Sequence, residues 1–235
     1  MKQKMILSKV AEKGFITCIR IMLKYVKKHV CGISRVIIFE RDLQQRHTPT
    51  APLFSPSFKN ATKEDIQQLN KQEFAYDKKN KQYAFLRIDK GDKCILAMDN
   101  KQIIGYIWVM YDQMELSPKN YIPLSTERAY VYNIFVIPSY RKKKLSYGMD
   151  NYLFERFKQQ QIRYVVVTVD MDTPISKRSR QHAGFIRIGL IIKFRFFGLK
   201  YDFVSRKVRS YLLNTTIASN SQQSKINGKK QGNKP

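Results

Sequence analysis

The fold and the candidate site of this chain are indicated most clearly by the stretch Val136-Ile-Pro-Ser-Tyr-Arg-Lys-Lys-Lys-Leu-Ser-Tyr-Gly148. A predicted strand rich in β-branched and aromatic residues, Arg128–Val136, leads into it, and Pro138 ends that strand. A basic loop follows, and a predicted helix over Ser146–Gln160 begins at once. Free amides at a helix N-terminus stabilise an anion, and Arg141–Lys144 adds four cationic side chains. The loop is therefore predicted to hold a phosphate group, with a solvated basic turn as the alternative.

The chain downstream of this stretch predicts another strand, a helix and a hairpin. Ile162–Val169 is a continuous apolar run, which is typical of a strand buried on both faces. Pro174–His182 reads as a short helix with proline in its first turn, and Gly184 ends it. Phe185–Phe197 and Lys200–Val204 are predicted to form the closing hairpin.

Upstream, the sequence predicts a hairpin and a helix. Lys93–Met98 and Ile103–Tyr111 are two strands joined by a tight turn. Ala61–Phe74 is expected to be helical, with Thr62 as N-cap and Asp65 completing an acidic capping box. These elements alternate with the later strand–helix–strand unit, and such alternation predicts an α/β fold. We expect a mixed, mostly antiparallel, twisted sheet flanked by helices.

Three regions are predicted along the chain. Residues 1–57 are expected to form a basic N-terminal region with an amphipathic helix, a short strand at Val36–Glu40 and a polar connector. Residues 58–210 are expected to form the main domain. Residues 211–235 are rich in Asn, Gln, Ser and Lys and are expected to be a disordered tail.

The run Ile134-x-Val136-x-Pro138-x-Tyr140-Arg141 resembles the fourth strand and the following loop of the GNAT N-acetyltransferases. In that family an Arg/Gln-x-x-Gly-x-Gly/Ala loop binds the pyrophosphate of coenzyme A through backbone amides. Arg141 matches its first position, while Lys144 and Ser146 stand at the glycine positions. The pair Gly184-Phe185 resembles a second landmark of the family. The resemblance covers roughly residues 60–200 and implies an acyl-CoA N-acyltransferase-like domain.

The resemblance also implies a set of site residues. Residues expected to contact acetyl-CoA are Ile134, Phe135, Val136, Arg141, Lys142, Lys143, Lys144, Leu145 and Ser146. The backbone N–H of Phe135 or Val136 is the expected donor to the oxyanion. Tyr132 stands where the family often carries a glutamate base, which makes it a candidate for proton transfer. Packing on the strand is the alternative reading of Tyr132.

Three departures from the family pattern bear on turnover. Lys144 makes the loop shape more costly than glycine would. Thr173 replaces a common asparagine, and Arg180 replaces a tyrosine that often protonates the leaving thiolate. Because arginine is permanently charged, it is a poor proton donor. The preferred reading of Arg180 and its neighbours Lys177 and Arg178 is a solvated helix face, with contact to an anionic group as the alternative.

The charge of the chain is strongly positive and unevenly placed. Lys and Arg number 44 against 18 Asp and Glu, a net charge of +26. Residues 61–136 carry 11 basic and 10 acidic groups, net +1, whereas residues 137–210 carry 17 and 5, net +12. Such a field attracts polyanions, including phosphorylated cofactors, anionic lipid and nucleic acid. No RNA-binding motif is evident, which makes nucleic acid the less favoured partner.

The cysteines and histidines are scattered, so neither a metal site nor a disulfide framework is expected. A reducing compartment such as the cytoplasm fits this pattern. Residues 5–30 predict a helix with an apolar arc beside a basic arc. That helix is expected either to lie on an anionic membrane surface or to dock on the domain core, and it is too polar to span a bilayer.

The function predicted from these features is acetyl-CoA-dependent acyl transfer. The acceptor is an amine or hydroxyl of unknown identity, by analogy one formed at a membrane. The alternatives are a catalytically inactive CoA-binding module and a basic RNA-associated module with the same fold. No spanning helix is expected, since no run of 18 apolar residues occurs.

Overall fold

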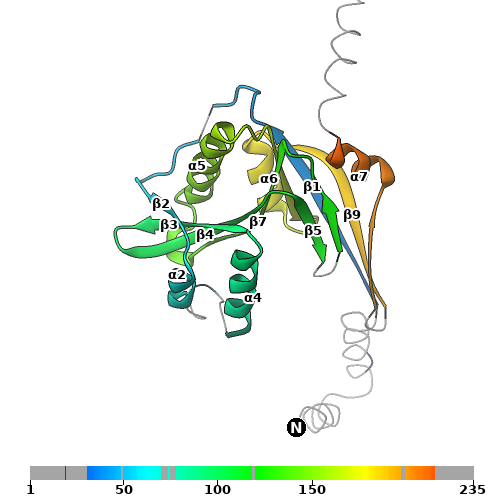
Figure 1. Ribbon diagram of the computed structural model, residues 1–235, viewed down its shortest axis with the longest axis horizontal. Helices are drawn as coiled ribbons and strands as arrows, with labels where there is room; N and C mark the ends of the chain where they lie inside the picture. Colours follow the sequence, from blue (N-terminus) through cyan, green and yellow to red (C-terminus); the bar gives the residue numbers. More distant parts are fainter. Residues whose placement is uncertain are drawn as a thin grey trace, which may run out of the picture.

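The computed structural model describes residue 19, residues 31–48, 50–69, 74, 78–117, 120–196 and 199–214. Within these residues an eight-stranded sheet forms the centre of the molecule (Figure 1). Its strands, in spatial order, are β10 (Leu199–Val204), β9 (Ile186–Phe196), β1 (Cys31–Asp42), β8 (Tyr164–Asp170), β7 (Arg128–Val136), β4 (Gln102–Met110), β3 (Lys93–Asp99) and β2 (Ser57–Asn60). Neighbours are antiparallel except for the parallel pair β7–β8, so the predicted α/β sheet is confirmed.

Helices cover both faces of this sheet. They are α2 (Lys63–Gln68), α4 (Lys78–Asp89), α5 (Leu145–Gln159), α6 (Pro174–His182) and α7 (Arg206–Leu213), with a 3₁₀ turn η1 at Pro138–Tyr140. In Figure 1, α5 and α6 lie on one face, and α2 and α4 lie on the other. A small hairpin of β5 (Gln113–Ser117) and β6 (Asn120–Pro123) stands beside the sheet and contacts α7. The buried core is made by apolar side chains of β1, β4, β7, β8 and α5.

Several local predictions are confirmed. The β3–β4 and β9–β10 hairpins form, and α5 and α6 begin and end within two residues of the predicted bounds. The capping box also forms: Asp65 N–H donates to Thr62 Oγ1 at 3.2 Å, and Thr62 N–H donates to Asp65 Oδ2 at 3.0 Å. The helix is shorter than predicted, because Leu69 is extended and ends α2 after Gln68.

The first strand differs most from its prediction. We predicted a short strand at Val36–Glu40, but β1 spans Cys31–Asp42 and lies between β8 and β9. Its first part, residues 31–35, pairs with β9 and carries no strand pattern of its own. Long-range pairing therefore overrides the local signal there. The segment assigned to a separate N-terminal region supplies an interior strand of the sheet.

Several elements were not predicted: β2, α4, the β5–β6 hairpin, the turn η1 and α7. The beginning of the predicted tail is wrong, because α7 continues to Leu213 and Leu212 is fully buried. Tyr211 also belongs to α7, and its hydroxyl donates to Glu40 Oε1 at 2.5 Å. Ser205 Oγ accepts from Val208 N–H as the N-cap, a signal that could have predicted this helix.

The predicted helix over residues 5–30 lies outside the described residues, apart from position 19. In the part of the chain that the structure describes, no helix is long and apolar enough to cross a membrane.

The sheet opens between β7 and β8. These strands pair only from Arg128–Val131 to Tyr164–Val167, and beyond that point they diverge. Asn133 has a positive φ of 49°, and the β4–β7 register shifts beside it, which marks a β-bulge. The bulge bends β7 away from β8, so the edges of both strands face an opening in the middle of the sheet.

Candidate functional site

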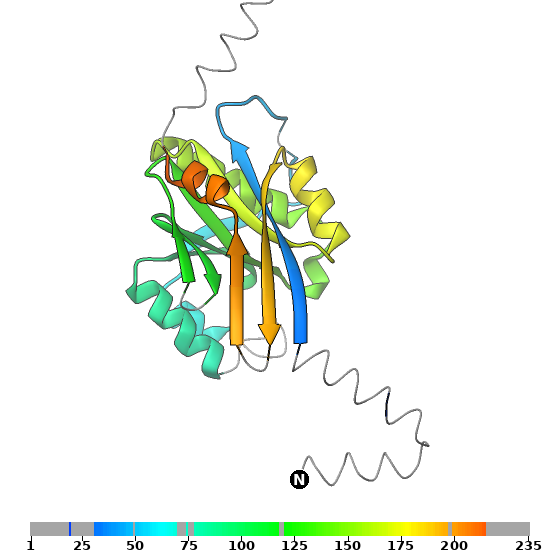
Figure 2. The ribbon, with the colours of Figure 1, turned by 90° about the vertical axis from the view of Figure 1, so that its right-hand side faces the viewer.

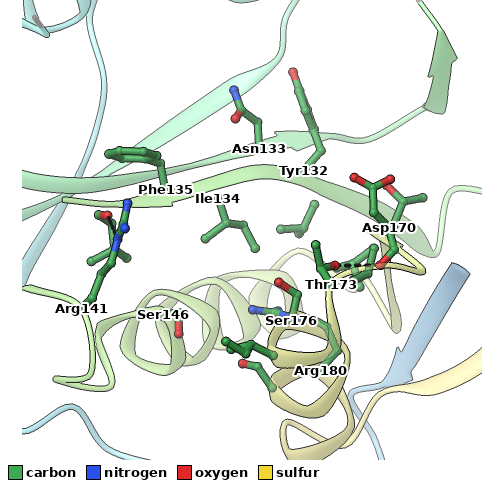
Figure 3. A pocket seen from close by; sticks show the side chains of 17 residues that line it. Tyr132, Asn133, Ile134, Phe135, Arg141, Ser146, Asp170, Thr173, Ser176 and Arg180 are labelled. Carbon is green, nitrogen blue, oxygen red and sulfur yellow. Dashed lines mark hydrogen bonds between the residues drawn. The ribbon is translucent and has the colours of Figure 1, made fainter. Parts of the chain in front are cut away.

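A cavity of about 500 Å³ occupies the opening between β7 and β8, on the face covered by α5 and α6. Figure 3 shows residues of both strands and both helices around it. The residues that line it are Val131, Tyr132, Asn133, Ile134, Phe135, Val136, Arg141, Ser146, Val167, Thr168, Val169, Asp170, Thr173, Ile175, Ser176, Ser179 and Arg180. We call it the β7–β8 cleft.

A second cavity, of about 390 Å³, lies across the sheet from the β7–β8 cleft. It shares Tyr132, Asn133 and Thr168 with the cleft, so the two cavities meet at the opening. Its other walls come from α4, β5, β9 and β10. We call it the second pocket. Two cavities that border the same three residues allow two reactants to approach one point of the sheet.

The structure separates the predicted cofactor contacts into two groups. Ile134, Phe135, Val136, Arg141 and Ser146 line the β7–β8 cleft. Arg141 also folds back on its strand, where Nε donates to the Val136 carbonyl at 3.2 Å. The remaining predicted contacts do not line the cleft: Lys142, Lys143 and Lys144 are exposed, and Leu145 is buried in the core. The Lys143 ammonium lies 4.3 Å from the Tyr140 ring centroid.

The backbone of the basic loop keeps a glycine-like shape despite its lysines. Lys144, which stands where the family pattern has glycine, is the N-cap of α5 with φ 60° and ψ 20°, in the left-handed region. Lys142 has a φ of 65°. Such a conformation costs a non-glycine residue about 1–2 kcal/mol. The loop holds this conformation at two positions, and it leaves the first amides of α5 without helical partners, as at any helix N-terminus.

The connector before β2 braces this loop. Leu53 N–H donates to the Lys143 carbonyl at 3.1 Å, and Asn151 Nδ2 donates to the Thr50 carbonyl at 3.0 Å. A Cβ at Gly148 would lie 3.1 Å from Pro52 Cγ, so the connector packs closely against the first turns of α5. A segment that the sequence indicates only as polar connector therefore positions the helix N-terminus.

Arg180 is buried rather than solvated, which overturns the preferred reading of the α6 surface at this position. Its side chain is 7% exposed, and Nη1 lies 2.8 Å from Oδ2 and 3.0 Å from Oδ1 of Asp150, a buried residue of α5. Burial raises the pKa of Asp150, while Arg180 lowers it. The pair joins α5 to α6 beneath the cleft, and the sequence pattern of α6 alone gave no sign of its partner.

Tyr132 reaches from β7 to a buried carboxyl group. Its hydroxyl donates to Asp92 Oδ2 at 2.5 Å, and its ring stacks on Tyr130 with centroids 5.4 Å apart. Burial raises the pKa of the Tyr132 phenol well above its usual value. Burial also raises the pKa of Asp92, whereas its hydrogen bond from Tyr132 and the charge of Arg87 lower it. In Figure 3 Tyr132 points away from α5 and α6, toward the side of the second pocket.

The second pocket has charged walls of both signs. Arg87 Nη2 of α4 lies 3.3 Å from Glu115 Oε2 of β5. The guanidinium of Arg87 also lies 4.9 Å from the Tyr132 ring centroid. The remaining charged wall residues come from β9 and β10: Lys193, Arg195, Lys200 and Asp202. Sequence reasoning assigned none of these residues to a site, because they come from elements far apart in the chain.

Polar side chains from the β8–α6 turn complete the cleft. Thr173 Oγ1 donates to the Asp170 carbonyl at 2.7 Å, which fixes the turn, and Ser176 and Ser179 face the cavity from α6. Among the described residues no group of three or more His, Cys, Asp or Glu could hold a metal ion. Cys94 is a buried free thiol, and burial raises its pKa.

The family model of the acetyltransferase (GNAT) family matches residues 58–185, more than half of the 235-residue chain. This chain belongs to that family. No curated protein sequence matches it.

Solved structures show the same fold at low sequence identity. A GNAT-family acetyltransferase from Colwellia psychrerythraea has a TM-score of 0.51 at 12% identity, and the match covers 71% of this chain and 57% of that one. A tandem GNAT protein of clavulanic acid biosynthesis has a TM-score of 0.51 at 14% identity, covering 74% and 55%. A conserved protein of unknown function from Staphylococcus epidermidis has a TM-score of 0.50 at 8% identity, covering 74% and 66%. The match spans little more than half the length of the first two proteins.

Proposed function

We propose that this chain transfers the acetyl group of acetyl-CoA to an amine or hydroxyl acceptor. The observation that carries the proposal is the opening between β7 and β8, with the β7–β8 cleft on one side and the second pocket on the other. Acetyl-CoA would supply an activated thioester carbonyl. The acceptor would enter from the second pocket and meet that carbonyl at the opening.

The residues of the β7–β8 cleft suit a nucleotide thioester. The N-terminus of α5 offers backbone amides and a positive dipole end to a pyrophosphate, and the Arg141 guanidinium stands beside it. The apolar side chains of Ile134 and Val169 suit a pantetheine arm running between the strands. The backbone N–H of Phe135 or Val136 remains the proposed donor to negative charge on the attacked oxygen.

Tyr132 and Asp92 form the proposed path for the acceptor's proton. The phenol oxygen can accept a hydrogen bond from the attacking group while its own proton is held by Asp92 Oδ2. When the acceptor attacks, its proton passes to the Tyr132 oxygen as the phenol proton passes to Asp92, so the phenol is neutral before and after. Arg180 is held by Asp150 and keeps its charge, so the leaving thiolate takes its proton from solvent.

The proposal is tested by measuring release of free thiol from acetyl-CoA in the presence of a panel of amines and amino sugars. Acceptor-dependent thiol release supports transfer. Tight acetyl-CoA binding without release from any acceptor supports instead the inactive CoA-binding module, for which the replacement of a tyrosine by Arg180 is the supporting observation. RNA binding that disappears between low and moderate salt, without CoA binding, supports the third reading.

The N-terminal membrane tether also remains a proposal. Residues 1–30 carry eight basic residues and one acidic residue, which favours an anionic surface. We propose a cytoplasmic protein that lies on the inner face of a membrane through residues 5–30. Fractionation of cells expressing the full chain tests this: recovery in the soluble fraction at low and high salt alike contradicts the tether.

A further inference from the structure

An exposed apolar surface covers the free end of the sheet, where β1, β9 and β10 extend beyond the other strands (Figure 2). In register, Leu199 lies opposite Phe196, and Tyr201 lies opposite Phe194, which in turn lies opposite Ile33. Because residues paired across strands share a face, these side chains point the same way. The surface, which we call the ribbon face, consists of Ile33 (67% exposed), Phe194 (41%), Phe196 (53%), Leu199 (56%), Tyr201 (60%) and Phe203 (61%).

The opposite face of the same three strands is polar. Lys193, Arg195, Lys200 and Asp202 alternate with the ribbon face and line the second pocket. Lys193 Nζ donates to the Leu116 carbonyl at 2.7 Å, which ties this polar face to β5. Such alternation is typical of a strand with one face exposed to solvent and the other face packed against a partner. Clustered apolar and aromatic side chains of this kind mark an interaction surface.

Charge decides among the possible occupants of the ribbon face. The chain as a whole has a net charge of +26, and Arg35, which is exposed on β1 and lies opposite Ile192 in register, places a cation on the ribbon face itself. A second copy of the chain would bring the same positive charge against it, and residues 1–30, with eight basic residues and one acidic, would do the same. An anionic bilayer is complementary to the ribbon face in two ways. Its negative head groups attract the cations, and its apolar boundary contacts the aromatic rings.

We therefore propose that the ribbon face of β1, β9 and β10 docks on an anionic membrane surface, with its apolar and aromatic side chains inserted at the head-group level. Tyr and Phe suit that depth, since one end of a Tyr side chain is apolar and the other is polar. The surface is separate from residues 5–30 and does not depend on the transfer reaction. A docked ribbon would turn its polar face, and with it the wall of the second pocket, away from the lipid.

Co-sedimentation of the full chain with vesicles of phosphatidylcholine and phosphatidylglycerol tests the affinity. We expect binding to these vesicles and weaker binding to pure phosphatidylcholine. Leu199→Ser with Phe203→Ser should lower the partition coefficient about tenfold or more, because both side chains lose apolar contact with lipid. Leu53→Ser is the matched control, since Leu53 is 67% exposed on the connector and outside the ribbon face.

Insertion of the ribbon itself is tested by placing a reporter on it. Tyr201→Trp in the full chain should lose fluorescence with vesicles containing brominated lipid, and Leu53→Trp should not. Trp108 is the single native tryptophan and is fully buried, so it contributes a constant background.

Three results would overturn the proposal. Failure of the full chain to bind anionic vesicles is the first. Vesicle binding without quenching at position 201 is the second, since residues 5–30 or another basic surface would then account for the binding. The third is a dimer in light scattering that Leu199→Ser with Phe203→Ser dissociates, without quenching at position 201, because the ribbon face would then bind a second copy. Thermal unfolding of each variant checks that the fold is retained.

Discussion

The two sides of the opening between β7 and β8 are built in different ways. The β7–β8 cleft is made largely by one continuous piece of chain, the strand β7, the basic loop and α5, with β8 and α6 following directly. The second pocket is assembled from α4, β5, β9 and β10, which together span more than one hundred residues of the chain. The first side uses backbone amides and a helix N-terminus, whereas the second uses charged side chains. A site made from local backbone geometry can be inferred from sequence, and one made from distant side chains cannot.

The largest expected effect concerns the ion pair beneath the cleft. Arg180→Leu should destabilise the protein by about 3–5 kcal/mol, because it leaves the Asp150 carboxylate buried without its partner. Arg178→Leu, at an exposed position of the same helix, should change stability by less than about 0.5 kcal/mol. Denaturant unfolding measures both.

Adding Asp150→Leu to Arg180→Leu should recover much of that loss, since no charge then remains buried. Equal stability of the wild type and Arg180→Leu would mean that the arginine is solvated after all, as the sequence pattern of α6 indicates.

The next effect distinguishes proton transfer on the side of the second pocket from acetyl-CoA binding in the β7–β8 cleft. Tyr132→Phe should lower turnover about 100-fold and leave acetyl-CoA affinity unchanged, because it removes the hydroxyl of the proton path and keeps the ring that lines the cleft. Tyr211→Phe is the matched control: its hydroxyl also donates to a carboxylate at 2.5 Å, but neither Tyr211 nor its partner Glu40 lines either cavity. Steady-state kinetics with an accepted amine, together with calorimetry, decides between the roles. Full activity of Tyr132→Phe assigns the residue to packing.

A smaller effect tests which side chains of the basic loop contact the phosphates of acetyl-CoA. Arg141→Glu should weaken acetyl-CoA binding about tenfold, since it replaces a cation that lines the cleft with an anion. Lys143→Glu should weaken it less, because the Lys143 ammonium lies over the Tyr140 ring and outside the cleft lining. Calorimetric titration of both variants measures the difference. A larger loss in Lys143→Glu would place the phosphates on the outer side of the loop.

The smallest effect expected in the unmodified protein is a pH dependence of turnover that arises from Asp92. Burial raises the pKa of Asp92, opposed by Tyr132 and Arg87 and assisted by the nearby charges of Asp112 and Glu115. Since the proposed path needs the ionised carboxylate, turnover should rise with pH through a value above the ordinary range for aspartate. Asp92→Asn should remove this rise along with most of the activity, and a wild-type profile flat over that range argues against the path.

The same shift has a consequence for stability. The folded state binds the Asp92 proton more tightly than the unfolded chain does, so this contribution is complete below the unfolded pKa. It is lost as the pH rises through the folded pKa. Asp92→Asn should therefore become more stable relative to the wild type as the pH rises. Denaturant unfolding of both proteins across the acid range measures this trend.

The fold was predictable where sequence pattern and local geometry agree. β7, the loop and α5 form a single strand–turn–helix unit, so their periodicity and the position of Pro138 were sufficient. β1 was predicted too short because residues 31–35 become a strand only by pairing with β9. The strand–turn–helix unit also explains why Ile134 and Arg141 line the cleft. It does not explain why Lys142 points away from the cleft, because the direction of that side chain depends on the positive φ of Lys142.

The side-chain pairs around the opening could not be predicted from the sequence. Asp150 and Arg180 are thirty positions apart on two helices, and Tyr132 and Asp92 are forty apart. Nothing in the local pattern of either partner indicates the other, because each pair exists only through the packing of distant elements. The sequence therefore indicated Tyr132 as a candidate residue but did not indicate its partner Asp92.

The most direct test of the account is a calorimetric titration of acetyl-CoA into the full chain at moderate salt, for the wild type and for Arg141→Glu. The account predicts saturable binding of one acetyl-CoA per chain, weakened about tenfold in the variant. Absence of binding to the wild type at millimolar acetyl-CoA would contradict the central claim that the β7–β8 cleft is an acetyl-CoA site.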